Sequence, residues 1–281
     1  MSQILAKKKI RQVFYKTALG KYLWKTLAFV TFRTIKKPTF SGWGMTTFTS
    51  TPWDVNSNQS TFKDSNEIVT QKILNGELIL SQFSYLNKTQ LLKELNNLQW
   101  RHYIVFWSAE YVIKSCKGSN NFVECGVCDG LTIFYAILAS KKEGKYYLYD
   151  SWAPMINKNL HETEEHLEGR YSNLVLDNTK RNLVQFNDSI YYNVGYIPDS
   201  FTTSINPDNL CWLHIDINSA FATLESLLYF YPKLASKGII LFDDYAQLEF
   251  AETKKLIDNF FEDKDGIFLH LPTGQGIYFK N

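Results

Sequence analysis

Residues 210–245, LCWLHIDINSAFATLESLLYFYPKLASKGIILFDDY, alternate between two kinds of apolar pattern. The short β-rich runs at 210–217 and 239–242 predict strands, and the amphipathic stretch 220–234 between them predicts a helix. A strand, a crossover helix and a second strand form the repeating unit of a parallel sheet. This stretch therefore predicts an α/β fold in which the sheet is mainly parallel.

The alternation extends over residues 121–281, which we expect to form one domain. Further strands are predicted at 122–127, 146–149 and 190–197 and around Ile267 and Ile277, and further helices at 131–140, 168–187 and 248–261. Residues 67–120 have helical spacing of apolar residues, which predicts helices packed on that core. Residues 38–66 are rich in Ser, Thr, Gly, Pro and Asn and contain several aromatics, which is typical of a loop that covers a pocket as a lid. We expect this loop and residues 1–37 to form the third part of the chain, residues 1–66.

Charge is distributed unevenly along the chain. The first 53 residues contain ten of the 30 Lys and Arg and no acid, whereas the remainder holds all 28 Asp and Glu. A basic amphipathic helix in this arm has three interpretations: a solvated face of a packed helix, an anchor on an anionic membrane surface, or a transit peptide. Nucleic-acid binding is disfavoured because no recognition motif accompanies the charge.

Composition restricts the class of protein. A chain of 281 residues with 45% hydrophobic residues is neither collagen-like nor wholly disordered. Its four cysteines are too few for a disulfide scaffold. The chain has no apolar run of about 18 residues, so we expect neither a membrane-spanning helix nor a secretory leader. We therefore expect a cytoplasmic protein with reduced thiols, in contact with a membrane surface only if the basic arm binds one.

A glycine turn follows the first predicted strand, in 122–130, FVECGVCDG. Glycine at the carboxyl end of a parallel strand lets a ligand approach the backbone, although a routine strand-to-helix turn has the same pattern. The segment is not GxGxxG, so a dinucleotide is disfavoured. Asp150 ends the next strand, where a carboxylate can accept hydrogen bonds from both hydroxyls of a ribose. Together these features indicate a ligand that contains a nucleoside.

Three acids end the two strands of the opening stretch: Asp216 the first, and Asp243 with Asp244 the second. Neighbouring strand ends lie at one edge of a sheet, so these carboxylates are expected to converge. Clustered carboxylates repel one another unless a cation or a proton intervenes, and hard oxygen ligands suit Mg²⁺, Ca²⁺ or Mn²⁺. The alternative is that they are helix N-caps, for which Asp is favoured.

Other reactive side chains carry weaker signals. Cys125 and Cys128 form a single CxxC, which is weak evidence for zinc or redox chemistry without a second pair. His214 lies in an apolar strand and is expected to be a core histidine. His161 and His166 lie among Glu162, Glu164 and Glu165, which predicts either a solvated charged face or a lid that supplies a general base.

Several of these segments, in this order, resemble the macrocin O-methyltransferase family, S-adenosylmethionine-dependent enzymes whose relatives methylate sugar hydroxyls of antibiotics. The resemblance rests on FVECGVCDG, YLYDSW (147–152), YYNVGYIPDSF (191–201), LHIDINSAFATLESLLYFYPKLASKGIILFDDYA (213–246) and LPTGQG (271–276). Residues 1–120 match it poorly. Asn218 stands where the family often has an acid, and Ala220 and Phe221 lie where it has Tyr.

The resemblance implies a class I methyltransferase fold, Rossmann-like, with a mainly parallel seven-stranded sheet flanked by helices. It implies Mg²⁺ at Asp216, Asp243 and Asp244, and contacts to the methyl donor from Glu124, Gly126, Asp150 and Ser151. Asp216 or His166 would then accept the proton of the attacking hydroxyl.

The expected activity is transfer of a methyl group from S-adenosylmethionine to a hydroxyl of a sugar or glycosylated metabolite with vicinal hydroxyls. Two alternatives stay open: an enzyme that methylates a catechol-like diol, and a non-catalytic module that binds the donor. Related enzymes are often multimeric, so a homo-oligomer is a further expectation.

Overall fold

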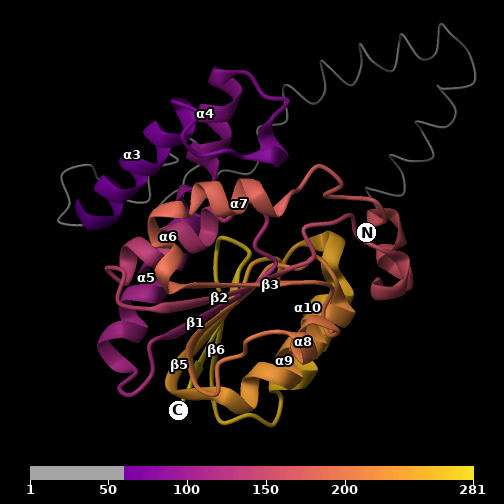
Figure 1. Cartoon of the computed structure of the whole chain (residues 1–281). Coiled ribbons are helices and arrows are strands. Elements are labelled where there is room, and N and C mark those ends of the chain that lie inside the picture. The colour runs from indigo at the N-terminus through magenta and orange to yellow at the C-terminus, as the bar shows by residue number, and fades with distance from the viewer. Residues whose placement is uncertain (1–59) are drawn as a thin grey trace, which may run out of the picture. The chain divides into compact units, whose positions relative to one another are not determined.

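The computed structural model describes residues 60–281 (Figure 1). The expectations for the basic arm, and for the lid as far as residue 59, lie outside the described residues. Among residues 60–281, no helix is long and apolar enough to cross a bilayer.

A seven-stranded sheet with the order β3-β2-β1-β4-β5-β7-β6 forms the centre. The five strands β1 to β5 run parallel, whereas β7 is antiparallel to both β5 and β6. Their bounds are β1 Asn121–Cys125, β2 Lys145–Asp150, β3 Ile190–Val194, β4 Leu210–Ile215, β5 Leu234–Phe242, β6 Gly266–His270 and β7 Gly276–Lys280. The predicted α/β fold with a mainly parallel sheet of seven strands is therefore confirmed.

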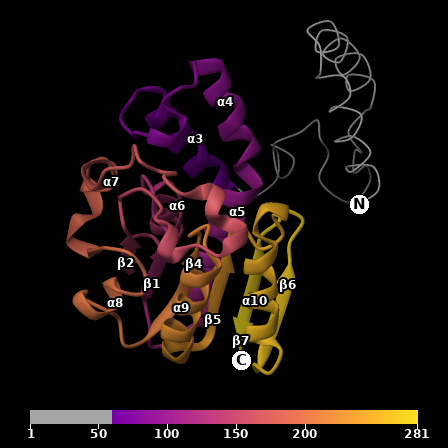
Figure 2. The same ribbon diagram turned by 90° about the vertical axis from the view of Figure 1, so that its right-hand side faces the viewer.

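Helices cover both faces of the sheet (Figure 2). Side chains alternate along each strand, so Phe122 of β1 lies in the core under one set of helices and Val123 in the core under the other. The first set is α3 Ser60–Leu74, α4 Lys88–Asn97, α5 Gln99–Ser115 and α6 Leu131–Ala139. The second is α8 Ser200–Thr203, α9 Ala220–Phe230 and α10 Ala251–Phe261. Because both faces are covered, the central strands are mostly apolar, with the buried polar residues Glu124 in β1 and His214 in β4 as exceptions.

Several element boundaries differ from the prediction. The helix expected over 168–187 is only α7 Leu176–Asn182, followed by the 3₁₀ turn η4 Val184–Ser189. Helix α9 ends at Phe230 because Pro232, in the next turn, has no amide proton and in a continuing helix would clash with the carbonyl of Leu228, four residues earlier. Helix α3 already begins at Ser60, within the segment expected to be loop.

Residues 60–115 are joined to the sheet by buried polar contacts. Ser81, in the 3₁₀ turn η1 Ser81–Phe83, donates from its amide and its hydroxyl to the two carboxylate oxygens of Asp129, at 2.6 and 2.9 Å. The Asn182 side chain accepts from the amide of Ile79 and donates to its carbonyl. Asp129 lies in the turn after β1, so the N-terminal helices are connected directly to that turn.

Gly126 is required by a close approach between two strand ends. Its φ is +86°, and a Cβ added there would lie 1.9 Å from the carbonyl oxygen of Asp216, just beyond β4. No side chain fits at that distance. The glycine therefore sets how closely the turn after β1 approaches the end of β4.

Gly126→Ala is expected to lower the free energy of unfolding by about 2–4 kcal/mol, because the added methyl group clashes with the Asp216 carbonyl and alanine is strained at this φ. Gly118→Ala is the matched control. Its φ is +93°, but an added Cβ there meets nothing within 4 Å, so we expect a loss of about 1 kcal/mol. Urea unfolding followed by circular dichroism measures both, and equal losses would contradict the close approach as the cause.

Candidate active site

A cavity of about 330 Å³ lies at the carboxyl ends of the parallel strands. Its wall is built from the segments that follow β1, β2, β4 and β5, the edge at which ligands of such sheets bind. Six residues expected from the sequence to act in the site line it: Gly126, Asp150, Ser151, Asp216, Asp243 and Asp244. Sequence reasoning therefore located the cavity, although two of its candidate residues lie elsewhere.

Asp150 holds the glycine turn in place. Its Oδ2 accepts hydrogen bonds from the amides of Val127 and Cys128, at 2.7 and 2.8 Å, and its Oδ1 accepts from the amide of Trp152 at 2.7 Å. Burial raises the pKa of Asp150, and these amide donors act against the rise. A carboxylate has about four acceptor positions, so at most one direction on Oδ1 is left for a ribose hydroxyl.

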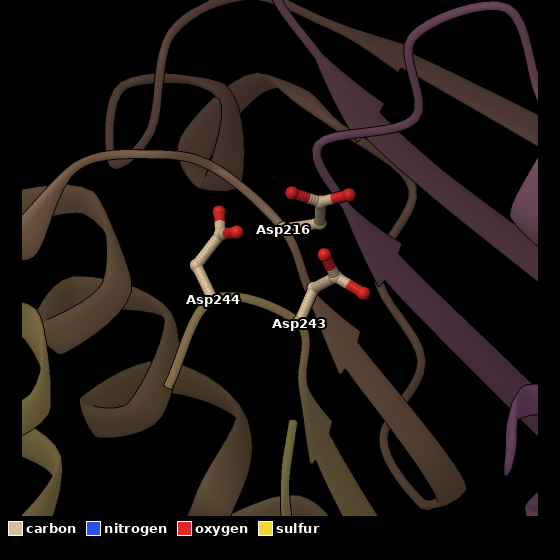
Figure 3. A group of neighbouring side chains, drawn as sticks. All are labelled: Asp216, Asp243 and Asp244. Atoms are coloured by element: carbon tan, nitrogen blue, oxygen red, sulfur yellow. The ribbon is translucent and has the colours of Figure 1, made fainter. Parts of the chain in front are cut away.

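Asp216, Asp243 and Asp244 converge as expected, and one carboxylate oxygen from each lies within 4.8 Å of the others (Figure 3). Backbone hydrogen bonds beyond the strand ends place them: the amide of Asp216 donates to the carbonyl of Cys125, and that of Asp243 to Ile215. The N-cap of α9 is Ser219 and that of α10 is Phe250. Helix capping therefore does not explain the three acids.

Arg101 of α5 is paired with this acidic cluster, and sequence reasoning missed it. Its Nη2 donates to Oδ2 of Asp216 at 2.7 Å and to Oδ2 of Asp243, while its Nε donates to Oδ1 of Asp243. The side chain is 30% exposed and lines the cavity. A single basic residue at the start of an apolar helix was the available signal, but it does not identify the partner.

Burial and mutual repulsion raise the pKa of Asp216 and of Asp244. The pKa of Asp216 lies well above its usual value because of burial and the Asp243 charge, and Arg101 counteracts both. Burial and the same charge raise the pKa of Asp244 to about 6. Burial opposes the charge on Arg101, but Asp243 and Asp216 outweigh it and raise the pKa of the guanidinium. The neighbouring His102 has its pKa lowered to about 3 by burial and by the Arg101 charge, so it is neutral.

Glu124 does not line the cavity and is wholly buried, which argues against the expected contact with a methyl donor. It points from β1 to the adjacent strand β4, where its Oε1 lies 2.9 Å from Nδ1 of His214. Burial raises the pKa of Glu124. His214 is a core residue, as predicted, but its Nε2 has no hydrogen-bond partner in the described part of the chain and lies 4.0 Å from Oδ1 of Asp243.

His166 does not line the cavity either. It is 53% exposed, in the 3₁₀ helix η3 Glu162–Leu167, and its Nε2 lies 2.9 Å from Oε1 of Glu249. Glu164 departs from the expected solvated face: it is fully buried and accepts a hydrogen bond from the amide of Ala220, at the start of α9. A helix N-terminus presents unpaired amides that favour an anion, which explains this buried carboxylate.

The remaining polar residues of the site have structural partners. Asn218 donates to Asp244 and accepts from the hydroxyl of Tyr171, a second cavity residue that sequence reasoning missed.

The two cysteines of the CxxC are separated in the structure. Cys125 is buried in the core, and only Cys128 lines the cavity. Burial raises the pKa of both thiols, which disfavours the thiolates that redox and zinc chemistry need.

Comparison with known proteins supports the fold. Residues 123–245 match the family described as a methyltransferase domain. No curated protein matches the chain in sequence. Among solved structures, the O-methyltransferase NovP is similar, with a TM-score of 0.55 at 16% identity, over 64% of this chain and 79% of NovP. CalS11, a calicheamicin methyltransferase, is similar with a TM-score of 0.52 at 12% identity, over 85% of this chain and 98% of CalS11.

The matched family covers the glycine turn, Asp150 and all three clustered acids. The expectation of a methyltransferase is thereby confirmed, whereas membership of the macrocin family stays a prediction. Residues 123–245 match the family described as a methyltransferase domain, and the fold of the described residues is similar to those of NovP and CalS11.

Proposed function

We propose that the protein transfers a methyl group from S-adenosylmethionine to a hydroxyl of a sugar or a glycosylated metabolite, as the resemblance to the macrocin family implies. One observation carries the proposal: a single cavity of the methyltransferase domain combines the glycine turn after β1 with the three carboxylates after β4 and β5. NovP is an O-methyltransferase and CalS11 a calicheamicin methyltransferase, in agreement with a small-molecule acceptor.

The donor would lie along the glycine turn. Gly126 leaves the backbone open to a ligand, Asp150 fixes the turn, and Ser151 lines the cavity beside it. A sulfonium methyl group is already activated, so the protein's task is to hold an acceptor oxygen in line with it at near-attack distance.

The chemistry of the acidic cluster suits Mg²⁺, because three carboxylate oxygens are hard ligands within reach of one ion. Asp216, Asp243 and Asp244 would hold it, once Arg101 no longer engages the first two. A bound divalent ion supplies a Lewis acid that lowers the pKa of a vicinal hydroxyl and orients it.

Asp216 is the better candidate for the general base. It lines the cavity, and burial beside Asp243 raises its pKa, which favours proton acceptance. His166, the other candidate, is turned to Glu249 and has no place in the cavity wall.

A donor-binding module without transfer is the second candidate, and one observation favours it: Arg101 already engages two of the three carboxylates. A catechol-like diol is the alternative acceptor, since it presents the same vicinal oxygens. Supplying sugars and catechols side by side distinguishes the acceptors.

Three further expectations remain proposals. They are contact of the basic N-terminal arm with a membrane, a cytoplasmic location and a homo-oligomer.

Calorimetric titration with S-adenosylhomocysteine tests the donor site. Wild-type protein is expected to bind in Mg²⁺ and in EDTA alike, because the glycine turn lies apart from the metal ligands. Asp150→Asn is expected to weaken binding at least tenfold, about 1.4 kcal/mol, because an amide nitrogen replaces one acceptor of the turn's amides. The exposed Asp188→Asn is the control and should bind as wild type does. Absence of binding by wild-type protein under both conditions would refute the donor site.

Methyl transfer to a panel of vicinal diols tests the acidic cluster. Asp243→Asn is expected to lower kcat/KM by roughly 100-fold, about 2.7 kcal/mol, and to abolish its dependence on Mg²⁺, because one of the three hard ligands is lost. Asp263→Asn changes a carboxylate that is 78% exposed and should have no effect. Full metal-dependent turnover by Asp243→Asn would show that the cluster has another role.

A further inference from the structure

Arg101 places a full positive charge where a metal ion would bind. A single guanidinium donates to both carboxylate oxygens of Asp243 and to Oδ2 of Asp216. Such planar pairing of arginine with carboxylate is among the strongest hydrogen-bonded geometries in proteins. The bonds reach from α5 to residues 115 and 142 positions away, so folding itself delivers the cation to the acids.

Arg101 is the cation that contacts the cluster in the described residues, and the buried His214 lies at its edge. His102 is held neutral beside the guanidinium, and Asp244 has only an uncharged amide donor, from Asn218. His214 is fully buried, its Nε2 is unpartnered, and that atom lies 4.0 Å from Asp243. One arginine against three carboxylates leaves an excess of negative charge, which attracts a further cation.

The arginine and a divalent ion require the same oxygens. Two cations a few ångströms apart repel strongly in a partly buried site, where the effective dielectric constant is far below that of water. The Arg101 side chain is 30% exposed and lies on the cavity wall, so it can withdraw toward the cavity without displacing α5.

We propose that Arg101 is an internal counterion that competes with a divalent cation for Asp216 and Asp243, so that metal binds only when the guanidinium leaves these carboxylates. The inference rests on the metal site of the proposed function and deepens it. It predicts a weak metal affinity in the wild-type protein and a tighter one whenever the arginine is removed.

Binding of Mn²⁺, measured by electron paramagnetic resonance of the free ion on the full chain, tests this competition. Arg101→Gln is expected to bind Mn²⁺ at least tenfold more tightly than wild type. Arg101→Lys keeps the charge but loses the planar fork, so its affinity should lie between the two. Arg170→Gln is the matched control, because Arg170 also lines the cavity but pairs with Glu249 instead of the cluster. Its affinity should stay within about twofold of wild type.

A second measurement is independent of the binding assay. Removing Arg101 leaves the carboxylates without their cation, so Mn²⁺ is expected to raise the Tm of Arg101→Gln more than that of wild type. If Arg101→Gln does not fold, as judged by circular dichroism, the Mn²⁺ affinity and the Tm shift of Arg101→Lys test the competition in its place.

Equal or weaker Mn²⁺ binding by the Arg101 variants would overturn the inference, and so would an equal gain in Arg170→Gln or no binding by any variant. Titration of the same samples with S-adenosylhomocysteine separates this failure from failure of the proposed function. Donor binding without a change in Mn²⁺ affinity would reject only the role of Arg101. Tighter Mn²⁺ binding without donor binding would support that role and reject the methyl-transfer proposal.

Discussion

The contact between Gly126 and the carbonyl of Asp216 is the constraint on which the site depends. Parallel strands β1 and β4 are neighbours, and only a residue without a side chain lets the turn after one pass so close to the end of the other. The same backbone segment that carries Gly126 along the cavity wall therefore fixes Asp216, the first of the three acids. The position of the glycine turn and that of the acidic cluster thus depend on one backbone contact.

Two carboxylates hold the protein together around that contact, and one of them, Asp150, was expected from the sequence to face a ligand. Asp150 uses three backbone amides to fix the turn, and Asp129 uses Ser81 to attach the N-terminal helices to it. Since Arg101 lies in one of those helices, the position of the cation at the acidic cluster depends on the same attachment. A buried carboxylate without such donors would be costly, which explains why every carboxylate oxygen of these two residues accepts a hydrogen bond.

The sequence predicted the strands and the three acids because both signals are local: an apolar run of the right length, and a polar residue where it ends. It could not predict Arg101, the pairing of Glu124 with His214, or the capping of α9 by Glu164. Each of these joins residues from 56 to 142 positions apart, and depends on which face of a helix or strand meets its neighbour. The same limit explains His166, whose sequence neighbourhood is acidic but whose partner, Glu249, comes from a distant segment.

Folding places one cation, the guanidinium of Arg101, beside the three carboxylates, so it offsets only part of their negative charge. A guanidinium is bound so firmly between Asp216 and Asp243 that burial does not remove its proton. Burial and the Asp243 charge still raise the pKa of Asp244 to about 6, and the side-chain donor to Asp244 is the uncharged amide of Asn218. A site built only for stability would replace such acids by apolar residues, which pack at no electrostatic cost. Three carboxylates around one arginine therefore fit the proposed binding event, in which a divalent ion replaces the guanidinium. The cavity at the carboxyl ends of the parallel strands is where that exchange would take place.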